Sequence, residues 1–180
     1  MKTEAAGVAS FILPDELIGR GVSLRAETPA DEPFLERLYI DVRWEELLQT
    51  QWPEEVRIAF LRDQFRLQRL HYLKYYHDAE FGVLTVADEE AGRLYLHHSP
   101  GEVRIVDISL LSAFRGKGIG TALLTSVLAF AESRARKVSI HVEKFNPAQH
   151  LYRRLGFQEA GESGPYWLME WTGGGGTESR

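Results

Sequence analysis

The sequence contains no cysteine. This absence excludes disulfides, thiolate metal ligands and a cysteine nucleophile in one step. The chain of 180 residues is nonetheless long enough to bury a core without such staples, since single domains cluster at about 100 to 200 residues. We therefore expect one folded domain in a reducing compartment.

Long apolar runs are also missing. No stretch approaches the roughly 20 apolar residues that span a bilayer, and the first residues lack the apolar core of a signal peptide. The sequence thus predicts a cytoplasmic protein that does not bind membranes.

Positive charge is scarce: 21 Lys and Arg stand against 26 Asp and Glu, for a formal net charge of -5. A protein that binds a phosphate backbone normally carries a basic surplus or a basic stripe. The charge therefore predicts that the protein does not bind nucleic acid. A cationic small molecule or an amine of a protein fits the charge better.

The two ends of the chain differ from its middle. Residues 1–20 show no sustained hydrophobic period, and the last eight residues read GGGGTESR, a glycine-rich polar segment. We expect a flexible N-terminal extension at 1–20, a single domain at 21–172 and a disordered tail at 173–180.

Hydrophobic periodicity assigns the elements between these ends. The patterns predict a strand at VSLRAET, helices that begin near Pro29 and Pro53, and a hairpin over FGVLTVADEEAGRLYLHH whose acidic turn is closed by Gly92. Further along they predict a buried strand at 102–111, a helix at TALLTSVLAFAESRARK, a strand at 138–142, a short helix at 147–155 and a last strand at YWLMEW.

A glycine-rich turn, SAFRGKGIGTALL, joins the strand at 102–111 to the following helix. Gly116, Gly118 and Gly120 have no side chains, so backbone N–H groups can approach phosphate oxygens at the positive end of the helix dipole. Arg115 and Lys117 add positive charge. The spacing matches neither the P-loop nor the dinucleotide fingerprint, so a pyrophosphate of another cofactor is the expected ligand.

Arg115, Gly118 and Gly120 form the pattern R-x-x-G-x-G, and HVEKFNPAQHLYRRLGF follows it. The two segments, in this order, resemble the two signatures of the GNAT superfamily of N-acetyltransferases. The resemblance implies an α/β fold with a central mixed, mostly antiparallel, twisted sheet of about seven strands. Helices cover both faces, and two strands splay apart at the acyl-CoA site.

The resemblance also implies acetyl-CoA as acyl donor and assigns residues to it. The pyrophosphate would bind the turn, and the pantetheine arm would pair with backbone groups of the preceding strand, whose last N–H would meet the thioester oxygen. The residues assigned in this way are Ile108, Leu110, Arg115, Gly116, Lys117, Gly118, Ile119, Gly120, Thr121 and Asn146.

Direct acetyl transfer to a primary amine needs an acid and a base. Tyr152 matches the family's usual general acid, because a phenol can protonate the departing thiolate. For the base, His141 stands slightly ahead of Asp107, and Glu102 is a further candidate. Outside the motif, Tyr152 would read as an ordinary core residue and His141 as a hydrogen-bonded strand residue.

The acceptor site is the least determined part. Gln64, Gln68, His71 and Tyr75 form a polar and aromatic line on the second predicted helix, which suits either an acceptor pocket or a solvated surface. The acceptor is a small-molecule amine or an amine of a protein or peptide; no metal site is expected, and a homodimer remains open. The rival functions are an acyl-CoA sensor without turnover, and an interaction protein whose second helix docks a partner.

Overall fold

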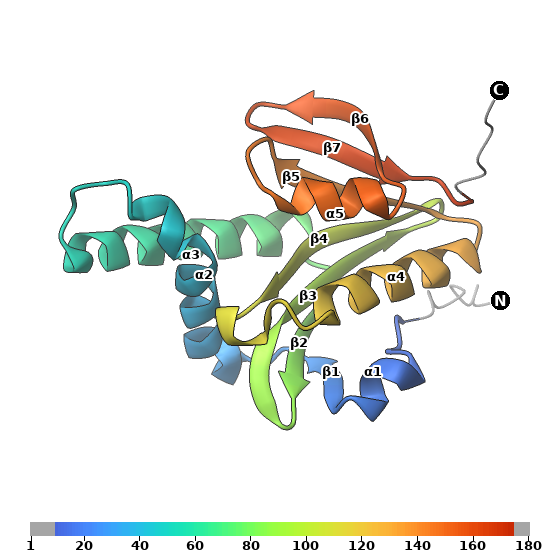
Figure 1. The fold of residues 1–180 in the computed structure, drawn as a ribbon, viewed down its shortest axis with the longest axis horizontal. Helices are drawn as coiled ribbons and strands as arrows, with labels where there is room; N and C mark the ends of the chain where they lie inside the picture. The colour runs from blue at the N-terminus through green and yellow to red at the C-terminus, as the bar shows by residue number, and fades with distance from the viewer. Residues whose placement is uncertain (1–9, 175–180) are drawn as a thin grey trace, which may run out of the picture.

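The computed structural model describes residues 10–174. Its centre is one sheet of seven strands in the order β1-β2-β3-β4-β5-β7-β6 (Figure 1). Every neighbouring pair is antiparallel except β4 with β5. The strands are β1 (Val22–Ala26), β2 (Glu80–Val86), β3 (Glu89–Ser99), β4 (Glu102–Leu110), β5 (Lys137–Glu143), β6 (Gln158–Ser163) and β7 (Tyr166–Trp171). The mixed, mostly antiparallel sheet expected from the sequence is confirmed.

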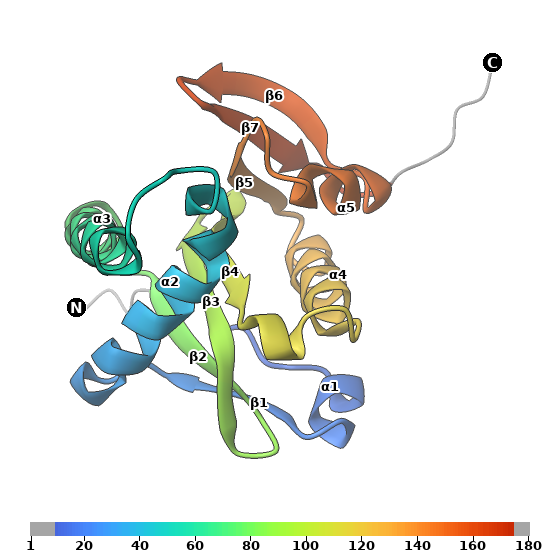
Figure 2. The same ribbon diagram turned by 60° about the vertical axis from the view of Figure 1, so that its left-hand side comes forward.

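Helices cover both faces of this sheet (Figure 2). They are α1 (Asp15–Gly19), α2 (Glu32–Leu47), α3 (Glu54–Tyr75), α4 (Ile119–Glu132) and α5 (Ala148–Arg154), with short 3₁₀ turns at Pro29–Asp31 and Ser112–Phe114. Two apolar clusters result, one under α2 and α3 and one under α1, α4 and α5. Val83 belongs to the first cluster and its neighbour Leu84 to the second, because successive strand residues face opposite sides.

The predicted apolar face of α4 is buried, with Leu123, Leu124 and Val127 at most 2% exposed. These positions recur at helical spacing, so they share one side of the helix. The helix begins after Gly118, whose φ of 78° is a left-handed conformation that costs glycine little. The glycine of the turn thus marks where α4 starts.

Strands β4 and β5 pair over only part of their length. The parallel register runs from Glu102 opposite Lys137 to Ile105 opposite Ile140 and then stops. At this point Val106 is an extra residue in β4, because Tyr95 pairs with Asp107 while the next residue of β3 pairs with Ile105. Such a bulge bends the strand and re-aims the side chains beyond it. The second half of β4 therefore has β3 on one side and an open edge on the other.

The expectation of a flexible extension over residues 1–20 is wrong for residues 10–20. Helix α1 forms there, Leu17 has no exposed surface, and Phe11 packs edge-on against Phe130 of α4. The apolar residues are too few to form a recognisable period, yet they cover one end of the core. Residues 1–9 of that extension and 175–180 of the expected tail lie outside the described residues.

Two details of the strands also differ from the sequence reading. The turn of the first hairpin lies at Ala87 and Asp88, both with positive φ, and Gly92 lies within β3. A Cβ on Gly92 would come 2.1 Å from the carbonyl oxygen of Ser109, so glycine is needed there for close strand approach. Strand β6 was not predicted, because its residues are exposed along its whole length and show no apolar alternation.

None of the helices formed by residues 10–174 is both long enough and apolar enough to cross a membrane.

Candidate active site

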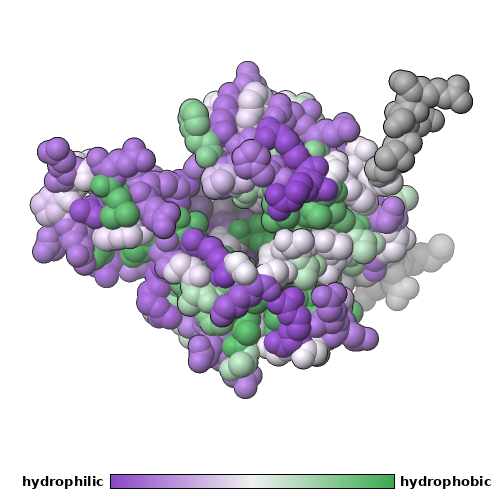
Figure 3. Space-filling model, in the orientation of Figure 1, coloured by the Kyte–Doolittle hydropathy of each residue, from purple (hydrophilic) through white to green (hydrophobic). Residues whose placement is uncertain are grey.

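A cavity of about 770 Å³ lies where β4 and β5 part, and α2 and α3 form its other wall. Figure 3 shows the surface hollowed here, between α3 and the part of the protein that carries β5, β6 and β7. Residues assigned from the sequence meet in it from three elements: Asp107 and Ile108 from β4, His141 from β5 and Tyr152 from α5. Asn146 lines it as well.

The floor of the cavity holds the Asp107 carboxylate in a network of donors. Arg93 Nη2 and the Tyr72 hydroxyl each donate to Oδ2 at 2.7 Å, and the Ser109 hydroxyl donates to Oδ1 at 2.5 Å. The side chains of Arg93 and Asp107 are only 4% and 11% exposed. The Asp107 carboxylate thus accepts three hydrogen bonds from side chains, and Oδ1 keeps a lone pair for one more donor.

Tyr152 is buried on α5, with 6% of its surface exposed. Burial, followed by the negative charge of Asp107, raises the pKa of Tyr152 to about 12. The phenol is therefore protonated throughout the neutral range. It can donate its hydrogen to a departing thiolate, but it is unsuited to take a proton from an amine.

His141 is held by Arg104, whose Nη1 lies 2.8 Å from His141 Nδ1. A guanidinium has donors only, so Nδ1 must accept and the neutral ring carries its proton on Nε2. Burial, followed by the charge of Arg104, lowers the pKa of His141. In this arrangement the one basic nitrogen is already occupied, which weakens the prediction that His141 is the base.

Glu102 lies at the opposite end of β4 from the open edge. It accepts hydrogen bonds from Ser139 and Arg104 and is not part of the cavity lining. Among the three base candidates, Asp107 is thus the one with a free lone pair inside the cavity.

The open edge of β4 carries the two backbone groups expected to meet the cofactor arm. The N–H of Leu111, directly after β4, donates to the Ala91 carbonyl at 2.8 Å. Because successive amides of a strand point to opposite sides, the N–H groups of Leu110 and Ile108 point away from β3. Beyond Ile105, no strand formed by residues 10–174 pairs with that edge.

The glycine turn follows this edge. Gly116 and Gly118 both have positive φ, at 71° and 78°, and the side chain of Arg20 donates to the Lys117 carbonyl from outside the turn. The Arg115 side chain, expected to add charge for the phosphates, binds the Leu110 carbonyl at 2.8 Å and Asp41 at 3.0 Å. Arg115 thus ties the turn to α2, and the turn offers its backbone amides.

Asn146 stands at the mouth of the cavity, just before α5. Its Oδ1 accepts the N–H of Ala148 at 2.9 Å, which satisfies one of the free amides at the start of a helix. The side-chain nitrogen of Asn146 is therefore the part that remains to bind a ligand.

Three of the four residues predicted on the acceptor side line the cavity: Gln64, Gln68 and His71. Tyr75 does not; it is 58% exposed and packs against His71 with ring centroids 4.7 Å apart. Tyr72 and Arg93 belong to the site but were not predicted. The one signal for Arg93 was a charged residue inside an otherwise apolar strand, GRLYL.

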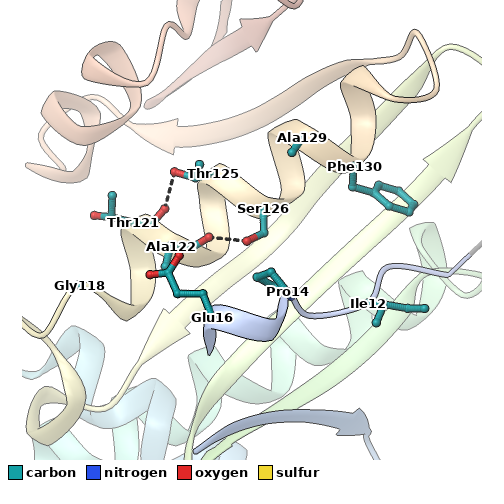
Figure 4. Close-up of a pocket in the computed structure, with 10 residues that line it drawn as sticks. All are labelled: Ile12, Pro14, Glu16, Gly118, Thr121, Ala122, Thr125, Ser126, Ala129 and Phe130. Atoms are coloured by element: carbon teal, nitrogen blue, oxygen red, sulfur yellow. Dashed lines mark hydrogen bonds between the residues drawn. The ribbon is translucent and has the colours of Figure 1, made fainter. Parts of the chain in front are cut away.

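A second cavity, of about 750 Å³, lies between residues 12–16 and the outer side of α4 (Figure 4). Two of its hydroxyl groups are engaged: Thr125 donates to the Thr121 carbonyl and Ser126 to the Ala122 carbonyl. Small side chains of α4 make up much of the remaining lining, so this cavity offers few groups for chemistry.

Part of the chain that builds this cavity also matches a known protein family. The model of the acetyltransferase (GNAT) family matches residues 41–157, a range that includes β4, the glycine turn, β5 and α5. The chain belongs to the acetyltransferase (GNAT) family. The resemblance seen in the sequence is thereby confirmed.

One curated relative in this GNAT comparison is a mycothiol acetyltransferase of Corynebacterium glutamicum, 35% identical over 98 residues. The match covers 53% of this chain and 34% of the relative. The chain thus spans about a third of the length of that curated relative.

Solved GNAT structures have the same fold. A PaiA N-acetyltransferase from Thermoplasma acidophilum in complex with coenzyme A superposes with a TM-score of 0.61 at 16% identity, covering 84% of this chain and 98% of that one. A GNAT family acetyltransferase from Elizabethkingia anophelis with acetyl-CoA bound gives a TM-score of 0.53 at 19% identity, covering 84% and 98%.

Proposed function

We propose that this protein transfers an acetyl group from acetyl-CoA directly to a primary amine. The observation that carries the proposal is the open edge of β4, which leads from the glycine turn past the Ile108 and Leu110 amides to Tyr152 and Asp107. Two structural neighbours that contain coenzyme A or acetyl-CoA support the choice of donor.

The residues divide the reaction between them. The neutral amine attacks the thioester carbon, and the oxyanion that forms accepts the Leu110 N–H; one such donor is typically worth about 10²- to 10³-fold in rate. The amine nitrogen loses its proton toward Asp107, directly or through water, and Asp107 then releases this proton to solvent. When the carbon–sulfur bond breaks, Tyr152 gives its proton to the thiolate and regains one from solvent. The products are the amide and coenzyme A.

The experiment combines binding and turnover. Acetyl-CoA is titrated calorimetrically, and thiol release is then followed with a panel of primary amines for the wild type and Tyr152→Phe. We expect the substitution to lower kcat by about 10²- to 10⁴-fold with little change in acetyl-CoA affinity. Tyr75→Phe is the matched control, because that tyrosine lies outside the cavity, and it should behave like the wild type.

The outcomes separate transferase from sensor. Tight acetyl-CoA binding without thiol release across the panel would favour a non-catalytic acyl-CoA sensor. Failure to bind acetyl-CoA would exclude both functions. Full activity of Tyr152→Phe would leave the transfer in place but remove Tyr152 as its acid.

A further inference from the structure

Two arginines determine which atoms of two cavity side chains remain free as hydrogen-bond donors. Arg93 and Arg104 each donate to a neighbour that lines the cavity, and each neighbour must then turn its own N–H groups elsewhere. We propose that these N–H groups bind a carbonyl or carboxylate oxygen next to the acceptor amine, so that the acceptor is an α-amino carbonyl compound. The inference rests on the proposed acetyl transfer and specifies its substrate class.

Gln68 of α3 is the first of these neighbours. Arg93 Nη2 lies 2.8 Å from Gln68 Oε1. Since a guanidinium only donates, the amide oxygen has to face it, and the orientation of the amide is not a free choice. The Gln68 NH₂ group is left without a hydrogen-bond partner among the described residues. It therefore presents two donors and no acceptor to a ligand.

The same arginine atom places Gln68 beside the expected amine site. Arg93 Nη2 bonds both Gln68 Oε1 and Asp107 Oδ2, at 2.8 and 2.7 Å. The two oxygens that accept from Arg93, Gln68 Oε1 and Asp107 Oδ2, thus lie within two hydrogen-bond lengths of each other. The carboxamide and the carboxylate are therefore neighbouring groups on the cavity wall, and one ligand can present an amine to Asp107 and an oxygen to Gln68. An α-amino carbonyl compound carries both groups, whereas a simple alkylamine has no oxygen to offer.

His141 supplies a second donor from the β5 side. Because Arg104 occupies Nδ1, the ring proton is on Nε2. The residue lines the same cavity as Gln68. The cavity is thus lined by the Gln68 NH₂ group from α3, the His141 Nε2–H group from β5 and the Asp107 carboxylate from β4.

The positive charges of Arg93 and Arg43 in the cavity are each paired with a carboxylate, so the ligand need not be an anion. Arg93 pairs with Asp107 at 2.7 Å, and Arg43 pairs with Glu143 at 2.7 Å. With these cations compensated by carboxylates, a neutral carbonyl oxygen suits the donors without requiring a formal charge. An amide or peptide carbonyl fits this environment better than a free carboxylate.

The test compares alaninamide with isopropylamine, which has a methyl group in place of the carboxamide. Because the two amines differ in basicity, kcat/KM is measured over a range of pH and expressed per concentration of neutral amine. We expect the wild type to favour alaninamide by about 10- to 100-fold, the range for one or two well-made hydrogen bonds. Alanine and a short peptide that begins with alanine complete the panel and separate carboxylate from carbonyl.

The decisive variant is Gln68→Met, which keeps the length of the side chain and removes its donors together with the oxygen that accepts from Arg93. We expect the ratio of kcat/KM for alaninamide to that for isopropylamine to fall to about one, with the acetyl-CoA affinity unchanged. Gln68→Glu, which offers oxygen only, should reduce alaninamide turnover at least as far. Gln51→Met is the control, because Gln51 is exposed in the loop before α3. Thermal unfolding verifies that each variant is folded.

Several results would overturn the inference. Equal use of the two amines by the wild type, or an equal loss for both in Gln68→Met, would remove Gln68 as the group that selects the acceptor. Turnover of alkylamines alone would leave acetyl transfer intact and reject only the α-amino carbonyl class. No thiol release with any amine would end both proposals.

Discussion

At the scale of single residues, the buried ion pair of Arg93 and Asp107 organises the site. Arg93 touches Gln68 of α3 and Asp107 of β4, and its guanidinium lies 5.1 Å from the ring centre of Tyr95. Its Nε is buried with no partner among the described residues. Such an incompletely satisfied cation is expensive to bury, which points to a role in the site beyond stability.

A double-mutant cycle measures this coupling. Arg93→Met leaves the Asp107 carboxylate buried without its cation, and we expect a loss of about 3–5 kcal/mol in the free energy of unfolding. Asp107→Asn should cost a comparable amount, while the double variant should cost clearly less than the two together. Urea denaturation of the four proteins gives the coupling energy. Additive losses would show that the pair is not coupled.

The sequence located part of this site. Tyr152 and Asn146 were predicted because they belong to one contiguous signature, HVEKFNPAQHLYRRLGF, and both line the cavity. Arg93 is brought near Asp107 by the pairing of β3 with β4, and Tyr72 by the position of α3 over the sheet. Apart from the charged residue in GRLYL, no local pattern marks these residues. The tautomer of His141 likewise depends on Arg104 of another strand.

At the scale of elements, the helices and strands predicted best are those with a clear hydrophobic period or with a glycine whose conformation marks their start. Helix α4 has both an apolar face and a glycine start; it was predicted at 121–137 and lies at Ile119–Glu132, so its start was predicted more closely than its end. Strand β6 has neither, since its order comes from pairing with β7. Helix α1 is shorter than two turns, so its apolar residues had too little length to reveal a period.

Gly118→Ala tests the glycine turn. The residue has φ of 78°, and an L-residue in this left-handed conformation costs about 1–2 kcal/mol. We expect that loss in the free energy of unfolding together with weaker acetyl-CoA binding, since the strain falls on the amides that would hold the pyrophosphate. Gly101→Ala is the control, because an added Cβ there meets nothing within 4 Å. Unchanged acetyl-CoA affinity in Gly118→Ala would argue against this role of the turn.

At the scale of the whole molecule, the segment before β1 is part of the fold. Leu17 has no exposed surface, whereas the adjacent Ile18 is 53% exposed. Leu17→Ala should therefore lower the free energy of unfolding by about 2–5 kcal/mol, as for other buried leucines, and Ile18→Ala should change it little. Urea denaturation of the two variants makes the comparison. Equal effects would mean that α1 does not pack in solution as described.

The limited pairing of β4 with β5 has a consequence for the whole sheet. Strands β1 to β4 form one block, strands β5 to β7 form another, and only the stretch from Glu102 to Ile105 joins them by parallel strand pairing. This ladder is the shortest between neighbouring strands of the described sheet, so opening motions should concentrate there. A ligand that lies along the free edge of β4 and also contacts β5 would hold the two blocks of strands together. Its binding should then slow amide exchange in β5 and β7 as well as in β4.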